Sequence, residues 1–205
     1  MRIDIWSDVV CPWCYIGVTR FDRALASVDG EVTVRLHPFQ LDPDAPIPGV
    51  PLREVYAAKF GAESDVVLER VTSEGAREGL DFNWDRAIRG NTFDAHRAIA
   101  YARQSDLDRD LEKRLFGAYF SEGLDVSDRA VLAAQGARVG LDRDRLAAYL
   151  ESDDGVDEVR RDLNDAYARG ITGVPSFLFE DEFMVPGAVD TASFTRILEQ
   201  MRALR

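Results

Sequence analysis

The sequence predicts an α/β core that is interrupted by a large all-α helical insertion. Three observations predict this fold class. Residues 1–41 follow a strand, helix, strand pattern, residues from about 52 to 169 carry helical patterns, and the last 32 or so residues return to strand, strand, helix. Split β elements around a helical block are typical of one core with an insertion. We therefore assign 1–52 and 170–205 to the two parts of the core domain and 53–169 to the insertion.

The first unit is predicted to be β-α-β. In RIDIWSD (2–8), apolar and polar residues alternate, which is typical of a strand. From Cys11 onward, apolar residues recur at helical intervals until Asp29–Gly30, which ends the helix. EVTVRLHPFQL (31–41) alternates again, and the proline-rich DPDAPIPGVP (42–51) then predicts a loop. Strand, helix and strand in this order favour a parallel pair with a right-handed crossover.

The insertion consists of amphipathic helical patterns without a convincing strand. The predicted helices cover 52–60, 64–79, 92–105, 107–123, 127–140, 142–152 and 155–170. Asn91 and Ser127 are predicted helix caps. Gly123, Gly140 and Gly170 stand just past predicted helix ends, where a left-handed residue is common.

The last unit is predicted to be β-β-α. VPSFLFE (174–180) and EFMV (182–185) have strand composition, and Asp181–Glu182 is the predicted tight turn between them. TASFTRILEQMRAL (191–204) places its apolar residues at a spacing of 3.6 and predicts a closing helix.

Composition excludes several classes of function. The formal net charge is −12 and the pI is about 4.6, so phosphate backbones and anionic membranes would be repelled. The N-terminus has no apolar run typical of a signal peptide, and no apolar stretch reaches the roughly 18 residues that cross a bilayer. We therefore predict a cytoplasmic protein with no nucleic-acid or membrane partner. Lasting structural disulfides are rare in that compartment.

Both cysteines of the chain lie in DVVCPWCYI (8–16), two residues apart. Such a pair can be a redox dithiol, half of a zinc site, or two inert core residues. His37 and His96 are the two histidines of the chain and neither lies in a cluster of metal-ligand spacing, so no metal site is predicted. A redox pair is the favoured interpretation.

The position of the pair gives each cysteine a role. Cys11 is expected at or just before the first helical turn, with Pro12 at the first helical position. The free N–H groups there favour an anion, so the Cys11 thiolate is stabilised, whereas Cys14 lies deeper in the helix. An exposed Cys11 is thus the predicted nucleophile and Cys14 the resolving thiol. Pro12 and Trp13 are predicted to tune the pair and to contact substrate, with Trp13 offering an apolar surface to peptides.

Two acidic residues flank this motif. Asp4 and Asp8 are hypothesised to help the resolving thiol lose its proton. His37, on the polar side of its strand, is interpreted as structural.

Several segments match a known family in order. They are IWSDVVCPWCYIG (5–17), HPFQLDPDAP (37–46), NTFDAHR (91–97), LFGAYFSEG (115–123) and GITGVPSFLF (170–179). Together they resemble the FrnE-like branch of the DsbA family of thioredoxin-fold oxidoreductases, over nearly the whole chain.

The resemblance implies a thioredoxin-like fold interrupted by a helical domain. It implies oxidation, reduction or isomerisation of disulfides, with protein or peptide thiols and disulfides as partners and no bound cofactor. Val174–Pro175 matches the cis-proline that faces the dithiol in that fold, and both residues are expected to contact substrate. Asn91 and His96, in NTFDAHR, are candidate substrate-binding residues, with helix capping and core packing as their alternatives.

Two features keep other functions open. Relatives often carry a Ser-Gly-Ala-Gln-like segment where this chain has PGAV (186–189), which puts the substrate contacts of that loop in doubt. Kappa-class glutathione transferases and hydroxychromene-carboxylate isomerases share the split fold, but commonly have serine at the position of Cys11. A glutathione-dependent isomerase or transferase, with glutathione as co-substrate, is therefore one alternative, and a non-enzymatic redox sensor or binding protein is another. The direction of the reaction, its substrate and the oligomeric state, monomer or homodimer, stay open.

Overall fold

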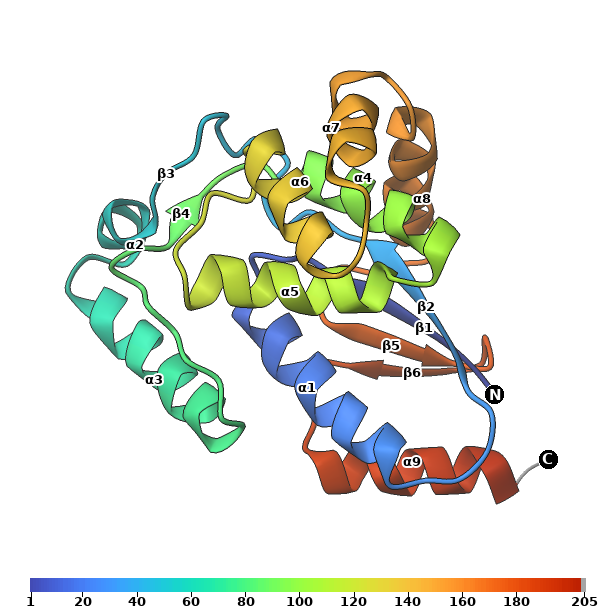
Figure 1. Cartoon of the computed structure of the whole chain (residues 1–205). Coiled ribbons are helices and arrows are strands. Elements are labelled where there is room, and N and C mark those ends of the chain that lie inside the picture. Colours follow the sequence, from blue (N-terminus) through green and yellow to red (C-terminus); the bar gives the residue numbers. More distant parts are fainter. Residues whose placement is uncertain (204–205) are drawn as a thin grey trace.

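A four-stranded sheet joins the two ends of the chain (Figure 1). The computed structural model describes residues 1–203. The strands lie in the order β2-β1-β5-β6, with bounds β1 Arg2–Ser7, β2 Thr33–Pro38, β5 Ser176–Phe179 and β6 Phe183–Pro186. β1 and β2 are parallel, whereas β1–β5 and β5–β6 are antiparallel. The predicted β-α-β and β-β-α units are thus confirmed, and β1 is the strand that connects them.

Alternation along the strands gives the sheet two different faces. Ile3 and Ile5 of β1 pair with Phe179 and Phe177 of β5, so these apolar side chains share one face. On that face lie α1 (Pro12–Ala26) and α9 (Thr191–Ala203), which pack side by side (Figure 1). Phe21 of α1 contributes an aromatic ring at 5.4 Å from the ring of Phe177.

The opposite face carries a second, smaller apolar cluster. Trp6 of β1 and Leu178 of β5 pack there with Ala166, which belongs to α8. His37 of β2, which is paired with Trp6 in the register, stacks on the indole ring at 4.7 Å. α8 therefore covers this face, and His37 has the structural role that we predicted.

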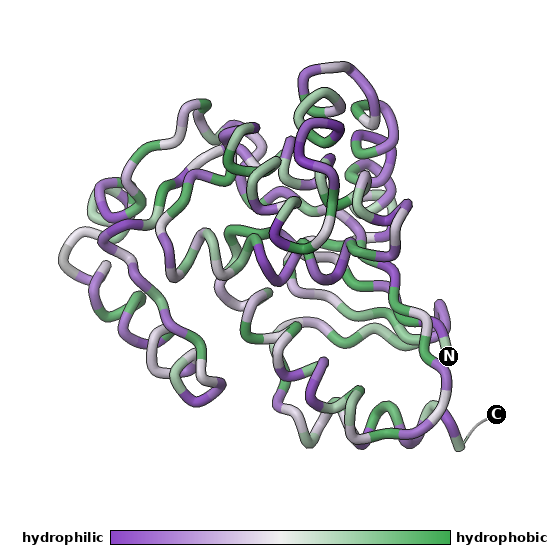
Figure 2. The backbone as a smooth tube through the Cα atoms, viewed as in Figure 1, coloured by the Kyte–Doolittle hydropathy of each residue, from purple (hydrophilic) through white to green (hydrophobic). Residues whose placement is uncertain are grey.

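The helical block lies between β2 and β5 in the sequence. Its helices are α2 Leu52–Phe60, α3 Ser64–Arg77, α4 Phe93–Ala102, α5 Asp108–Phe120, α6 Arg129–Arg138, α7 Arg143–Glu151 and α8 Val156–Ala168, with short 3-10 turns at Gly61–Glu63 and Arg103–Ser105. Figure 2 shows that α8, at the outside of the block, is mostly hydrophilic. The predicted helices are confirmed within a few residues at their ends. The domain boundaries at 52/53 and 169/170 stay a prediction.

The prediction of no strand within the insertion was wrong at Ile88–Arg89, and the last two residues of the predicted loop 42–51 also form a strand. β3 (Val50–Pro51) pairs antiparallel with β4 (Ile88–Arg89), forming a two-stranded ribbon beside α2. Each strand is two residues long, which is too short for an alternating pattern to be visible in the sequence.

Two local assignments also need correction. The cap of α6 is Asp128, whose carboxylate accepts hydrogen bonds from Ala130 and Val131, while the predicted cap Ser127 donates its hydroxyl hydrogen bond to Asp125. The turn between β5 and β6 is centred on Glu180 and Asp181, both with positive φ, rather than on Asp181–Glu182. Ser and Asp are almost equally good caps, so neighbouring candidates are distinguished only by the backbone path.

Candidate active site

The connection from β1 to α1 places the first cysteine at the helix N-terminus. Cys11 is the N-cap of α1, with extended backbone (φ −87°, ψ 112°), and Pro12 follows at the first helical position. The Cys11 amide donates to the Asp8 carbonyl at 2.9 Å, and the Cys14 amide donates to the Cys11 carbonyl at 3.0 Å. The local geometry predicted for the pair is therefore present, and the two cysteines are free thiols that form no disulfide.

The antiparallel pairing of β1 with β5 brings a distant loop to this dithiol. Trp6 lies opposite Ser176, so the residues just before β5 come next to the end of β1. The Val174–Pro175 peptide bond is cis, as the resemblance implies. The Cys11 Sγ lies 3.6 Å from the Val174 carbonyl oxygen, to which it can donate a hydrogen bond across 163 positions of sequence. Cys11, Cys14, Val174 and Pro175 are thus brought together.

The two thiols are both buried. Cys14 is fully enclosed, and burial is the main reason that its pKa is raised, with the neighbouring Cys11 thiol adding to the effect. Cys11 is only 3% exposed, so the expectation of an exposed nucleophile was wrong. Its sulfur faces the Val174 carbonyl instead of solvent. Tyr56 of α2, whose pKa is raised first by its own burial and then by Cys11, approaches from the insertion.

A pocket of about 550 Å³ opens beside the dithiol. It begins at Asp8 and Val10, the residues that lead into the motif, and continues along α2 and the start of α4. Its lining residues are Asp8, Val10, Leu41, Asp42, Ala45, Leu52, Val55, Tyr56, Lys59, Arg89, Gly90, Thr92 and Tyr119. The wall carries both cationic and anionic side chains on an otherwise apolar surface, which suits a small zwitterionic or peptide ligand.

The PGAV segment is held against the cis-proline. The Gly187 amide donates to the Pro175 carbonyl at 2.7 Å, and the Arg20 guanidinium donates to the Ala188 carbonyl at 2.9 Å. Gly17, in α1, faces the same contact, since a Cβ built there would lie 2.9 Å from Pro175 Cγ and 3.2 Å from Ala188 Cβ. Arg20 and Gly17 are positioning residues that the sequence analysis did not identify.

The close approach at Gly17 makes a testable prediction. Gly17→Ala adds a methyl group where no space exists, so we expect the free energy of unfolding to fall by about 1–3 kcal/mol. Gly117→Ala, in α5, is the matched control, because its Cβ would meet only the end of Arg114 at 3.5 Å. We expect the control to be unchanged or to gain up to about 1 kcal/mol from the better helix former. Urea unfolding of both variants measures their free energies of unfolding. Equal values for Gly17→Ala and Gly117→Ala would contradict this packing argument.

Asn91 and His96 both fasten the segment after β2. The Asn91 side chain accepts from the Phe93 amide at 2.9 Å and donates to the Pro43 carbonyl at 2.7 Å, so it bonds the first turn of α4 although Thr92 is the N-cap. His96 is buried, with Nε2 2.9 Å from the Phe39 carbonyl oxygen. Asn91 therefore has the alternative role of bonding the start of the helix, and His96 that of core packing. The roles of both residues as substrate contacts stay a prediction.

Of the residues inside the motif, Pro12 and Trp13 are partly buried. Trp13 packs against the main apolar core, and part of its surface stays available to a ligand. The predicted substrate contacts of Pro12 and Trp13 stay predictions.

The two acidic residues around the motif have different surroundings. The Asp4 carboxylate pairs with Arg2 at 2.8 Å and with His37 at 2.7 Å. Asp8 accepts the Leu41 amide through Oδ2 at 2.8 Å, and its Oδ1 lies 3.5 Å from His96 Nε2. Asp4 is thus occupied by Arg2 and His37, whereas Asp8 keeps one oxygen without a hydrogen bond among residues 1–203.

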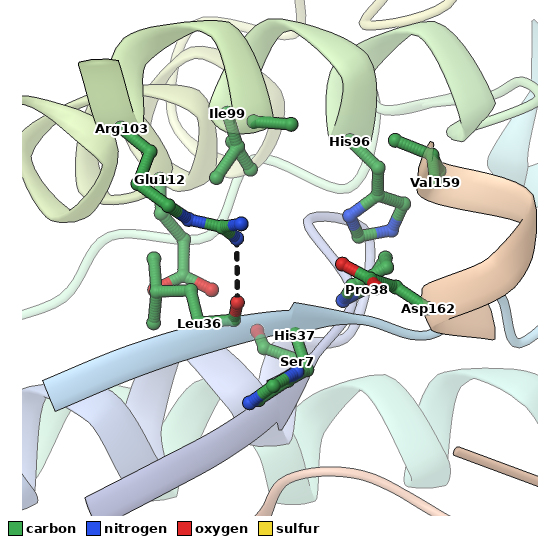
Figure 3. Close-up of a pocket in the computed structure, with 11 residues that line it drawn as sticks. Ser7, Leu36, His37, Pro38, His96, Ile99, Arg103, Glu112, Val159 and Asp162 are labelled. Carbon is green, nitrogen blue, oxygen red and sulfur yellow. Dashed lines mark hydrogen bonds between the residues drawn. The ribbon is translucent and has the colours of Figure 1, made fainter. Parts of the chain in front are cut away.

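Glu112 of α5 is a buried acid that the sequence analysis missed. It lies in a pocket with Ser7 and His96 (Figure 3), and burial raises its pKa to about 7. A signal was present in the sequence. Glu112 stands between Leu111 and Leu115, in register with the apolar stripe of the helix, so periodicity places its side chain on the buried face.

Neither a metal cluster nor a membrane-spanning helix is found in the part of the chain that the structure describes. No group of three or more His, Cys, Asp or Glu side chains within residues 1–203 is placed to hold a metal ion. None of the helices in that range is long and apolar enough to cross a bilayer.

Comparison with known proteins places this geometry in a family. The family model of the DSBA-like thioredoxin domain matches residues 2–199. The crystal structure of a probable DsbA oxidoreductase from Streptomyces coelicolor has a TM-score of 0.92 and 32% identity, and the match covers 100% of this chain and 91% of that one.

Two curated relatives extend the comparison. YwbO of Bacillus subtilis (strain 168), described as uncharacterized, is 27% identical over 200 residues, covering 97% of this chain and 96% of the relative. A 2-hydroxychromene-2-carboxylate isomerase from Sphingobium xenophagum is 31% identical over 85 residues, covering 42% and 44%.

Proposed function

Because the chain belongs to the family of DSBA-like thioredoxin domains, we propose that it is a dithiol–disulfide oxidoreductase that acts on protein or peptide thiols and disulfides through Cys11 and Cys14. The observation that carries this proposal is the contact between Cys11 Sγ and the Val174 carbonyl, immediately before cis-Pro175. An extended substrate strand that pairs with this backbone would present its sulfur to Cys11.

The reaction then follows from the asymmetry of the pair. In the reducing direction, the Cys11 thiolate attacks one sulfur of the substrate disulfide, whose S–S bond breaks to release the other sulfur as a thiolate. Cys14, as a thiolate, next attacks Cys11 Sγ, and the bond from Cys11 to the substrate breaks. The products are a Cys11–Cys14 disulfide and a fully reduced substrate. Oxidation of a substrate dithiol is the same sequence in reverse.

The direction is decided by the reduction potential of the pair. We expect thiol-trapping mass spectrometry across glutathione buffers to show a reversible Cys11–Cys14 disulfide. A midpoint of about −120 to −180 mV would assign an oxidase or isomerase, and one near about −270 mV a reductase. If no internal disulfide forms at any poise, and only a glutathione adduct on Cys11 is seen, this proposal is wrong.

A glutathione-dependent isomerase or transferase is the second candidate function. It is supported by the partial match to a 2-hydroxychromene-2-carboxylate isomerase and by the pocket beside the dithiol, with Lys59 and Arg89 in its wall. This candidate requires tight binding of glutathione and activity that survives Cys14→Ser. Isothermal titration with glutathione, compared between the wild type and Cys14→Ser, distinguishes it from dithiol exchange.

We place this chemistry in the cytoplasm, which the cysteine usage supports, since both cysteines belong to one reactive pair. Redox-state trapping in intact cells tests this placement: in a reducing compartment the pair should be mainly reduced at steady state.

A further inference from the structure

The helical insertion contacts the loop beside the dithiol through one guanidinium group. α3, which belongs to the insertion, lies beside α1, which belongs to the core (Figure 1). Arg20 of α1 contacts both α3 and PGAV (186–189), the segment at the end of β6. Arg20 is 9% exposed, so its donors are directed to protein groups rather than to solvent.

The guanidinium of Arg20 donates to three separate groups. Its Nε donates to Glu78 Oε1 at 2.6 Å, and one terminal nitrogen donates to Glu74 Oε2 at 2.9 Å. The other terminal nitrogen donates to the Ala188 carbonyl at 2.9 Å. The planar fork of a guanidinium holds several acceptors in fixed directions, which an ammonium group does not. Arg20 therefore fixes the 186–189 segment relative to the insertion.

The two carboxylates need a cation because of where they lie. Glu74 is in the last turn of α3, and Glu78 is the residue that follows the helix. The C-terminus of a helix carries a partial negative charge, so carboxylates there are unfavourable unless cations face them. Arg23 of α1 also pairs with the Glu78 carboxylate and donates to the Glu78 carbonyl at 2.8 Å. The side chain of Arg23 is 50% exposed, and within residues 1–203 it makes no hydrogen bond to the 186–189 segment.

A series of hydrogen bonds leads from Arg20 to the nucleophile. The Gly187 amide, next to the residue whose carbonyl Arg20 holds, donates to the Pro175 carbonyl at 2.7 Å. Val174 precedes Pro175, and its carbonyl oxygen lies 3.6 Å from Cys11 Sγ. The position of the Val174 backbone beside Cys11 is therefore supported from the insertion.

The Val174 backbone can pair with a substrate strand. Val174 is partly exposed, and its amide makes no hydrogen bond to another residue in the range 1–203. Its carbonyl oxygen has two acceptor positions, of which the Cys11 thiol uses one. An extended peptide can thus form backbone hydrogen bonds at this residue, as in other cases of strand addition. A small disulfide without a peptide backbone cannot form them.

We propose that Arg20 is a positioning residue for peptide substrates: anchored on the insertion, it holds the Val174 backbone where a substrate strand pairs with it. The inference rests on the proposed function, and it gives the insertion a part in the preference for extended peptides over small disulfides. Loss of the guanidinium releases the 186–189 segment from α3, so the Val174 backbone is no longer held in place. Pairing with a peptide then weakens, whereas attack of Cys11 on an unpaired sulfur is unchanged.

Two probes with the same leaving group separate strand pairing from sulfur chemistry. One is a short peptide whose central cysteine carries a thionitrobenzoate group, and the other is mercaptoethanol that carries the same group. In each case the Cys11 thiolate attacks the other sulfur of the probe, the S–S bond breaks, and thionitrobenzoate leaves with the electron pair. Stopped-flow absorbance gives the second-order rate constant for each probe and, from its saturation, the apparent affinity.

Arg20→Met is expected to lower the second-order rate constant for the peptide by about 10- to 100-fold, through a weaker apparent affinity. The rate for the mercaptoethanol probe should stay unchanged, whereas a general loss of stability would slow both probes alike. Arg20→Lys should show a smaller loss, because an ammonium group cannot hold both carboxylates and the carbonyl in one fork. Arg23→Met is the matched control, since it removes a cation from the same pair of helices and leaves the Ala188 contact intact. Both probes should react with this control as with the wild type.

An unchanged ratio of the two rate constants in Arg20→Met overturns this inference. An equal loss in Arg23→Met also overturns it, because the contact with Ala188 is then not the cause. If Arg20→Met does not fold, Arg20→Lys is the test, and a wild-type ratio in that variant overturns the inference.

The wild type itself distinguishes this inference from the proposed function. If it reacts with the peptide no faster than with the mercaptoethanol probe, no strand is recognised and the inference is wrong, while dithiol exchange stands. If it releases thionitrobenzoate but never forms the Cys11–Cys14 disulfide, the proposed function is wrong instead.

Discussion

Replacing Cys14 with serine is expected to stop the reaction halfway, with the substrate held on Cys11 as a mixed disulfide. The resolving sulfur is then absent, and the serine hydroxyl in its fully buried position cannot replace it as a nucleophile. Turnover of a model protein disulfide should fall by roughly 1,000-fold or more. Intact-mass spectrometry should show one substrate molecule bound to each chain, released by excess dithiothreitol.

Cys11→Ser provides the complementary result. We expect it to lose turnover to the same extent but to form no mixed disulfide, because the remaining Cys14 is fully enclosed and burial raises its pKa. The chain has no other cysteine, so any adduct is assigned without ambiguity, and the double variant is the blank. A Cys14→Ser variant with full activity would contradict dithiol exchange and favour the glutathione-dependent candidate.

Arg97→Met is expected to produce the largest loss of stability. Arg97 is 1% exposed and its guanidinium ties α4 to the end of α7 and to the connection that leads into α8. It pairs with Asp94 at 2.7 Å, and it donates to the carbonyl groups of Tyr149, Leu150, Ser152 and Asp154. Removing it leaves buried acceptors without donors, so the free energy of unfolding should fall by about 3–5 kcal/mol.

Arg145→Met is the matched control for this measurement. Arg145 is on α7, is 81% exposed on its side chain and lies 3.7 Å from Asp142. Exposed pairs of this kind contribute little, so we expect a change within about 0.5 kcal/mol. Arg97→Lys keeps the charge but lacks the planar fork, and it should recover only part of the loss. If urea unfolding gives the same stability for Arg97→Met and Arg145→Met, the network is not what holds these helices together.

The network also gives Arg97 a role that the sequence did not reveal. In NTFDAHR (91–97), Asn91 and His96 were candidate substrate-binding residues, with helix capping and core packing as their alternatives, and Arg97 was assigned no role. In the structure, Asn91 bonds the first turn of α4 and Arg97 fastens the helix to its neighbours. His96 in turn bonds the Phe39 carbonyl. Asn91, His96 and Arg97 therefore all make structural contacts.

Local patterns were sufficient for the element order and for the helix-terminal dithiol. Alternation in β1 and β2, helical spacing in α1 and proline at position 12 depend on neighbours in sequence, so they can be deduced without knowing the fold. The errors fell where several local solutions are nearly equal in energy. The cap of α6 and the centre of the β5–β6 turn each lie one residue before or after the predicted position. The two-residue strands β3 and β4 were not predicted.

The amino-acid sequence by itself thus determined that two thiols lie at a helix N-terminus after the first strand of an interrupted α/β core. Only the tertiary structure decided what surrounds them. The Val174 carbonyl reaches Cys11 through the β1–β5 register, Cys11 is buried, and burial raises the pKa of Cys14 and that of Glu112. These properties depend on desolvation and on contacts between residues far apart in the chain, which have no counterpart in a local pattern.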